Sequence, residues 1–212
     1  MSVLGPAVGT VGAFALGAFW WFLWEYVLHR WAFHELKGWG IGSREHLNHH
    51  ATAGWGFDPL ILLVWFGVLL TGVGWGFLAS LLLPGWPAAG FGTGWAVGYF
   101  FYEWHHRAAH LRAPRNRWEQ WLRVHHFHHH FGHPLSNHGV TIPLWDHVFG
   151  TFEQPEVVRV PRRLAMPWLL DGNGELKTEY ADRYELVGVV GRDERQAALD
   201  KARAFANLEP TP

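Results

Sequence analysis

The sequence predicts an all-α integral membrane protein, a helical bundle with about three transmembrane helices and a cytoplasmic helical cap. Two observations predict this fold class: long uncharged stretches have the length of membrane spans, and positive charges are confined to the segments outside them. Of the 212 residues, 49% are hydrophobic and 17% aromatic, the formal net charge is −1, and there are 16 His and 0 Cys. The lack of cysteine excludes disulfides, thiolate metal ligands and cysteine nucleophiles, and the near-zero charge favours no nucleic-acid partner.

Three stretches have the composition of membrane spans. They run from about Leu4 to Leu28, from Leu60 to Leu83, and from about Trp86 to Trp104. The second is uncharged over about 36 Å of helix, which is enough to cross a bilayer with some tilt. The third carries small residues at every fourth position, a pattern that lets helices pack closely. The alternatives are buried helices of a soluble protein and, for the first stretch, a cleaved signal peptide, although that stretch has no basic region before it.

The positions of Lys and Arg predict the orientation in the membrane. None of the 17 precedes Arg30, and none lies between Ala51 and Trp104. With three spans, the basic segments share one side, which the positive-inside rule assigns to the cytoplasm, so the N-terminus faces the opposite side of the inner or plasma membrane. We expect a membrane-embedded domain at residues 1–153 and a polar cytoplasmic tail at residues 154–212, packed on the cap, with a helix from about Arg192 to Leu208.

The histidines fall into two groups, and the charge pattern places both groups on the cytoplasmic side. The first follows the first span and the second follows the third span: His29, His34, His46, His49 and His50, then His106, His110, His126, His129 and His130. Residues three and four apart share a helix face, so each His-x2-His-His motif can direct three imidazoles to one place. The five-residue spacing of His29 and His34 predicts a helix end or a π-bulge there. Ten nitrogen donors are too many for one metal ion and suit two.

Two features near these histidines leave alternatives open. A shifted frame, His125-x2-His128-His129, also satisfies the spacing of the last motif. Glu25 and Glu103 lie close to the span ends, where a carboxylate either accepts the second ring N–H of a ligand histidine or reaches the membrane interface.

These segments resemble the fatty acid hydroxylase superfamily, which includes fatty acid 2-hydroxylases, sterol desaturases and carotenoid hydroxylases. The resemblance covers about Glu25 to Thr151. It rests on seven segments: Glu25–Arg30, Ser43–His50, Tyr102–His106, His125–Phe131, Asn137–Thr141, Pro143–Asp146 and Val148–Thr151. It implies a di-metal centre, O2 as co-substrate and a lipid substrate. Neutral imidazole ligands favour two Fe ions, which Zn can replace in purified protein, and we expect an external electron-transfer protein to supply the electrons.

Each residue of the site has an expected role. The resemblance selects as metal ligands the same ten histidines, with His126, His129 and His130 as the frame of the last motif. Five residues are expected to surround the ligands: Glu25, Glu103, Asp146, His125 and His138. Four aromatic residues are expected to line the substrate slot or simply to pack: Trp31, Phe127, Phe131 and Trp145.

The sequence therefore predicts a membrane-bound di-iron oxygenase that hydroxylates a C–H bond of a lipid, in the first place a fatty acyl chain. The same residues fit a lipid or sterol desaturase or a carotenoid hydroxylase. The alternative from another class is a non-catalytic membrane protein that binds or transports metal. A transporter would place its ligands at the membrane midplane on broken helices, whereas these histidines lie beyond the span ends.

Overall fold

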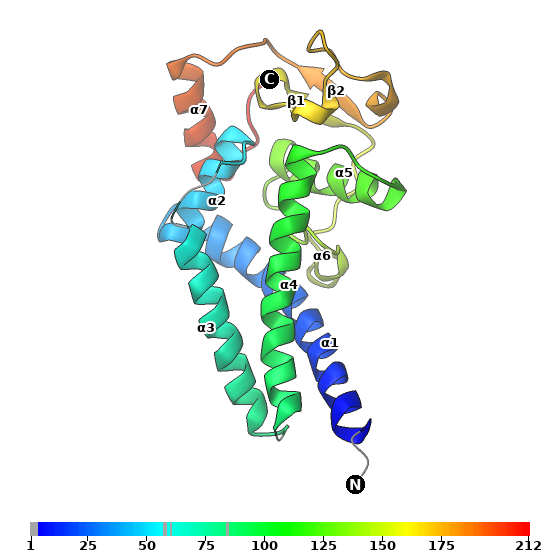
Figure 1. The fold of residues 1–212 in the computed structure, drawn as a ribbon. Helices are drawn as coiled ribbons and strands as arrows, with labels where there is room; N and C mark the ends of the chain where they lie inside the picture. The colour runs from blue at the N-terminus through cyan, green and yellow to red at the C-terminus, as the bar shows by residue number, and fades with distance from the viewer. Residues whose placement is uncertain (1–3, 57–58, 60, 84) are drawn as a thin grey trace. The chain divides into compact units, whose positions relative to one another are not determined.

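The structure is a computed structural model that describes residues 4–56, 59, 61–83 and 85–212. It is mostly helical, as expected (Figure 1). The chain divides into two compact units. Unit 1 comprises Met1–Glu25 and Phe57–Trp104, and unit 2 comprises Tyr26–Gly56 and His105–Pro212.

Long apolar helices form unit 1. Helix α1 spans Leu4–Val27, α3 spans Ile61–Ser80 and α4 spans Trp86–Leu111. Two stretches, Ala7–Glu35 and Ile61–Ser80, are long and apolar enough to cross a membrane. The first two expected spans thus coincide with such helices, although Leu60 lies outside the described residues. Helix α4 is not one of the two, so the arrangement with three spans and a cytoplasmic cap stays a prediction.

Glycines of α4 allow it to pack closely against α1. A Cβ added at Gly90 would lie 2.8 Å from the carbonyl oxygen of Thr10, and one added at Gly94 would overlap the carbonyl of Phe14. No residue larger than glycine fits these positions without moving the α1 backbone. The small residues at every fourth position therefore have the packing role that the sequence indicates.

Unit 2 is built from shorter elements. They are a π-helix at Leu28–Glu35, α2 at Ile41–Thr52, the last turns of α4, α5 at Arg117–Phe131, α6 at Leu144–Phe149, β1 at Val158–Pro161, β2 at Tyr184–Val187 and α7 at Glu194–Phe205. The π-helix confirms the prediction made from the spacing of His29 and His34. Helix α7 confirms the predicted C-terminal helix, and the side chain of Asp193 caps it by accepting from the amide of Gln196.

A small sheet corrects the expectation of an all-α fold. Strands β1 and β2 pair in parallel, with Val158 opposite Tyr184 and Pro161 opposite Val187. Each strand has 4 residues. A strand this short gives too few positions for an alternating hydrophobic pattern to stand out in the sequence.

The apolar core of unit 2 joins α5 to the C-terminal segment. Phe127 and Phe131 of α5 are buried with Val158, Val160 and Trp168. This core holds the helix that carries three of the predicted ligands.

Polar contacts complete the attachment of the C-terminal segment. Arg192 donates to the carbonyl of Ala51 at 2.8 Å, which ties the start of the α7 region to the end of α2. Asp200 of α7 is buried and pairs with Arg163 at 2.7 Å.

The domain boundary expected at residue 153 stays a prediction.

Candidate metal centre

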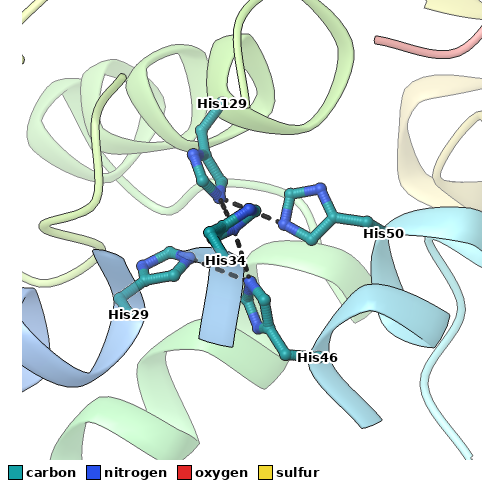
Figure 2. A group of neighbouring side chains, drawn as sticks. All are labelled: His29, His34, His46, His50 and His129. Atoms are coloured by element: carbon teal, nitrogen blue, oxygen red, sulfur yellow. Dashed lines mark hydrogen bonds between the residues drawn. The ribbon is translucent and has the colours of Figure 1, made fainter. Parts of the chain in front are cut away.

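The ten predicted ligands form two groups of five in unit 2. Within each group, one ring nitrogen of every histidine lies within 4.8 Å of those of the others. Group A consists of His29, His34, His46, His50 and His129, and group B consists of His49, His106, His110, His126 and His130. Figure 2 shows the five rings of group A directed toward one another.

Each His-x2-His-His motif divides its ligands between the two groups, which corrects the expectation that all three converge. Helix α2 gives His46 and His50 to group A, and His49 to group B. On a helix, position i+4 lies about 40° from position i, whereas i+3 lies about 60° away in the opposite sense. The outer pair therefore faces one group and the middle residue faces the other.

Helix α5 has the reciprocal arrangement. It gives His126 and His130 to group B and His129 to group A. The π-helix supplies the remaining two ligands of group A, and α4 supplies the remaining two of group B. The rings of His50 and His130 stack with centroids 4.1 Å apart, so the groups are adjacent.

Ring nitrogens within each group approach one another closely. In group A the Nε2 atom of His46 lies 3.0 Å from that of His29 and 2.9 Å from that of His34, contacts drawn as dashed lines in Figure 2. In group B, the Nε2 atoms of His110 and His126 are 3.0 Å apart.

Hydrogen bonds at the opposite ring nitrogen fix which nitrogen carries the proton. His129 Nδ1 donates to the carbonyl of Ser136 at 2.7 Å. His34 Nδ1 donates to Asn207 Oδ1 at 3.0 Å, and the Asn207 amide donates back to the carbonyl of His34, which fixes the amide orientation. When both rings are neutral, the Nε2 lone pairs of His34 and His129 therefore face each other, with the two nitrogens 3.2 Å apart.

The same pattern recurs at three more ligands, whose Nδ1 atoms face carbonyl oxygens. His29 donates to the carbonyl of His138 at 2.6 Å, His110 to that of Ala53 at 3.0 Å and His49 to that of Gly54 at 3.0 Å. These five ligands form one hydrogen bond outward and leave Nε2 as the inward donor atom.

Burial keeps the ligand imidazoles uncharged. It lowers the pKa of His46, His50, His126, His129 and His130 well below the ordinary value, and it lowers the pKa of His49 to about 4. Neutral imidazole is the form that binds metal. Facing lone pairs repel unless a cation lies between them, so the donor set fits bound metal. Imidazole donors without thiolate suit iron and zinc among other transition metals.

His125 and His128 lie outside both groups. His128 Nε2 is 2.7 Å from Oε2 of Glu153, and its side chain is partly exposed. His125 is buried, with Nε2 at 3.5 Å from Oδ2 of Asp146. The geometry thus favours the frame of His126, His129 and His130 over the shifted one.

Asp146 acts on the ligands through the backbone. Its carboxylate accepts from the amides of His138 and Gly139 at 2.7 and 2.8 Å and from the hydroxyl of Thr151 at 2.8 Å. These bonds hold the segment whose His138 carbonyl accepts from His29. The His138 ring is buried beside group A, with its centroid 5.4 Å from that of His29, but it belongs to neither group.

Glu25 and Glu103 belong to unit 1. Glu25 is buried, and Glu103 accepts from the hydroxyl of Tyr99 at 3.3 Å. Their expected contact with ligand histidines stays a prediction.

The four aromatic residues expected at a substrate slot differ in position. Phe127 and Phe131 lie in the apolar core, which favours the packing role. Trp145 is half-buried and Trp31 is 42% exposed, so these two remain available as lining residues.

Sequence reasoning found Asp146 and His138 but missed four other residues that orient ligands: Asn207, Ser136, Gly54 and Ala53. Asn207 lies beyond the resemblance, and Ser136, Gly54 and Ala53 contribute only carbonyl oxygens, which have no side-chain signature. Ala53 has φ of 48°, a left-handed conformation that is uncommon for alanine and ends α2. This conformation belongs to the turn whose carbonyl accepts from His110.

The fold and the site define a mostly helical protein with apolar helices and a histidine-rich centre suited to two metal ions. The family model for fatty acid hydroxylase matches residues 14–151, and the chain belongs to that family. The family membership confirms the resemblance inferred from the motifs.

Individual relatives agree with this assignment. The chain is 31% identical over 162 residues to fatty acid 2-hydroxylase of Macaca fascicularis, covering 69% of this chain and 41% of the relative. It is 33% identical over 157 residues to dihydroceramide fatty acyl 2-hydroxylase FAH2 of Arabidopsis thaliana, a match that covers 69% of this chain and 62% of that relative. A solved structure of full-length scs7p, in which only the hydroxylase domain is visible, matches with a TM-score of 0.53 at 28% identity. The match covers 70% of this chain and 58% of the scs7p chain. The chain thus spans less than two thirds of each of these relatives.

Proposed function

We propose that this chain is a membrane-bound di-iron oxygenase that hydroxylates a C–H bond of a lipid acyl chain. The observation that carries the proposal is the pair of five-histidine groups in a chain whose relatives are named as fatty acyl 2-hydroxylases. The reaction consumes the lipid, O2, two electrons and two protons, and it yields the hydroxylated lipid and water. The site and the C-terminus face the cytoplasm of the inner or plasma membrane, and a separate one-electron carrier supplies the electrons.

The protein's contribution follows from the arrangement of the ligands. Groups A and B each present five inward nitrogens, and outward hydrogen bonds such as that of His129 to Ser136 fix ring orientation before metal binds. Bound iron would supply the ability to activate O2 for attack on a C–H bond. Nine of the ten ligand side chains are buried, which keeps bulk water away from the reacting atoms.

Lipid mass spectrometry tests the reaction. Cells that express the chain are compared with cells that express a His50→Ala variant, and the lipid extracts are searched for mass changes. Gain of one oxygen on an acyl chain is the expected result. Loss of two hydrogens would instead identify a desaturase, and unchanged lipids would contradict the proposal.

Metal analysis tests the site separately from the reaction. We expect close to two ions per chain in active protein, with zinc competing for the same ligands in purified material because zinc binds such sites more tightly than ferrous iron. Fewer than one ion per chain in active protein would contradict the two-metal site. Bound metal without any O2 consumption would instead indicate a metal-binding protein with no catalytic role.

A further inference from the structure

A row of parallel rings on α5 runs from the protein surface to His125, the residue before the ligand His126. The centroids of Trp118 and Trp121 are 5.3 Å apart with 13° between the ring planes. Those of Trp121 and His125 are 5.5 Å apart with 14° between the planes. The spacings of three and four residues put all three rings on one face of the helix.

The two ends of this row differ in surroundings. Trp118 is 53% exposed, whereas His125 is 1% exposed. His125 is bonded directly to His126 of group B, and His129 of group A lies one helical turn further along. The row therefore runs along α5 from a ring exposed to solvent to a buried ring next to the ligands that α5 supplies to both groups.

His125, at the buried end of the row, has one acidic and one aromatic neighbour besides Trp121. Within the described part of the chain, neither ring nitrogen of His125 makes a hydrogen bond, and its Nε2 lies 3.5 Å from Oδ2 of Asp146. Phe152 stacks against the same ring, with centroids 5.6 Å apart and 25° between the planes.

Trp121 is held in line by its neighbours. Its Nε1 donates to Oε1 of Gln154 at 3.0 Å, and its ring lies 6.3 Å from Phe152 at 19°. Contact between conjugated rings shortens the gaps that an electron must tunnel across, and tunnelling weakens steeply with distance. Rings in offset stacking at these separations are in van der Waals contact.

We propose that Trp118, Trp121 and His125 form the route by which electrons from a one-electron carrier reach the metal groups. The inference rests on the proposed function, because it needs a metal site that accepts electrons. Each transfer oxidises the carrier by one electron, reduces the metal site by one electron and changes no covalent bond. Two transfers supply the two electrons of one hydroxylation.

The absence of cysteine allows a direct test. An Arg117→Cys substitution next to Trp118 gives one thiol, to which a ruthenium-polypyridyl photoreductant is attached. A light flash then injects one electron into the ferric full-length protein, and absorbance reports metal reduction. In the labelled protein a Trp121→Leu substitution is expected to slow reduction several-fold, Trp121→Phe is expected to retain most of the rate, and Gln120→Leu on the same helix is expected to leave it unchanged.

Metal content and helicity of each variant are measured first, so that a damaged site is recognised. If Trp121→Leu loses metal, Trp118→Leu replaces it, because the half-exposed Trp118 ring contributes little to the core. Equal reduction rates with and without these rings would overturn the route. Failure of the proposed function is distinguishable: it would appear as absent metal, which the metal analysis detects before any flash, or as unchanged lipids in protein whose bound metal is still reduced through these rings.

Discussion

His34 and Asn207 are 173 residues apart in the chain and are joined by two hydrogen bonds. The ring Nδ1 of His34 donates to the Asn207 side chain at 3.0 Å, and the Asn207 side chain donates to the His34 carbonyl at 3.2 Å. The C-terminal segment thus orients a ligand that is supplied by the N-terminal part of unit 2. A polar contact of this kind controls metal affinity through the direction of the ring.

Replacing Asn207 with glycine is expected to weaken metal binding. Glycine removes the side chain and still tolerates the left-handed φ of 56° at this position. We expect metal affinity to fall by about 10- to 100-fold, measured by competition with a coloured chelator. Asn173→Gly in an exposed turn serves as the matched control. Equal affinities in the two variants would show that Asn207 does not orient the ligand.

The carboxylate of Asp146 offers a second test away from the ligands. In Asp146→Asn one oxygen becomes an NH2 group, which cannot accept from the amide of Gly139 or His138. A buried amide left without an acceptor costs about 1–3 kcal/mol, so the free energy of unfolding should fall by that amount. The His138 carbonyl, which accepts from the His29 ring, would also be held less firmly, so metal content should fall.

Asp171 provides the matched control for this substitution. Asp171 accepts from the amides of Asn173 and Glu175 in the same manner, but it is exposed. In Asp171→Asn water replaces the lost acceptor, so chemical denaturation should show a much smaller change. The role assigned to Asp146 is wrong if both variants lose the same stability.

Metal removal is expected to destabilise the fold. Without a cation, Nε2 lone pairs such as those of His34 and His129 face each other at 3.2 Å. The midpoint of thermal unfolding in detergent, followed by circular dichroism, should therefore fall when a chelator strips the protein and should rise again when zinc is added. An unchanged midpoint in protein shown to be metal-free would mean that the histidine groups are stable without metal.

Local spacing explains what the sequence could predict. The five-residue interval between His29 and His34 predicts a helix end or a π-bulge, and the observed π-helix at Leu28–Glu35 is the second of these. Helix geometry separates the middle residue of each motif from the outer pair, but the reciprocal division between the two groups could not be predicted, since it depends on how α2 and α5 face each other. The role of Asn207 could not be predicted either, because a hydrogen bond between residues 173 positions apart leaves no periodic pattern in the sequence.

Membrane orientation can be tested through the C-terminus. The confinement of Lys and Arg to two segments predicts that Pro212 is cytoplasmic. A fluorescent protein fused there should fluoresce, whereas alkaline phosphatase, which needs an oxidising compartment, should stay inactive. The same two reporters fused before Met1 should give the opposite result. Active phosphatase at the C-terminus would reverse the proposed topology.

The frame of the last histidine motif separates residues that bind metal from their neighbours on α5. His126 and His130 point into group B, so their removal leaves an open coordination position, and alanine at either site should lose metal and activity together. His128 pairs with Glu153 at the surface, so His128→Ala should keep most of its metal. Metal analysis of these variants and of His125→Ala distinguishes the two frames. Loss of metal from His125→Ala and His128→Ala, with retention in His126→Ala and His130→Ala, would move the frame by one residue.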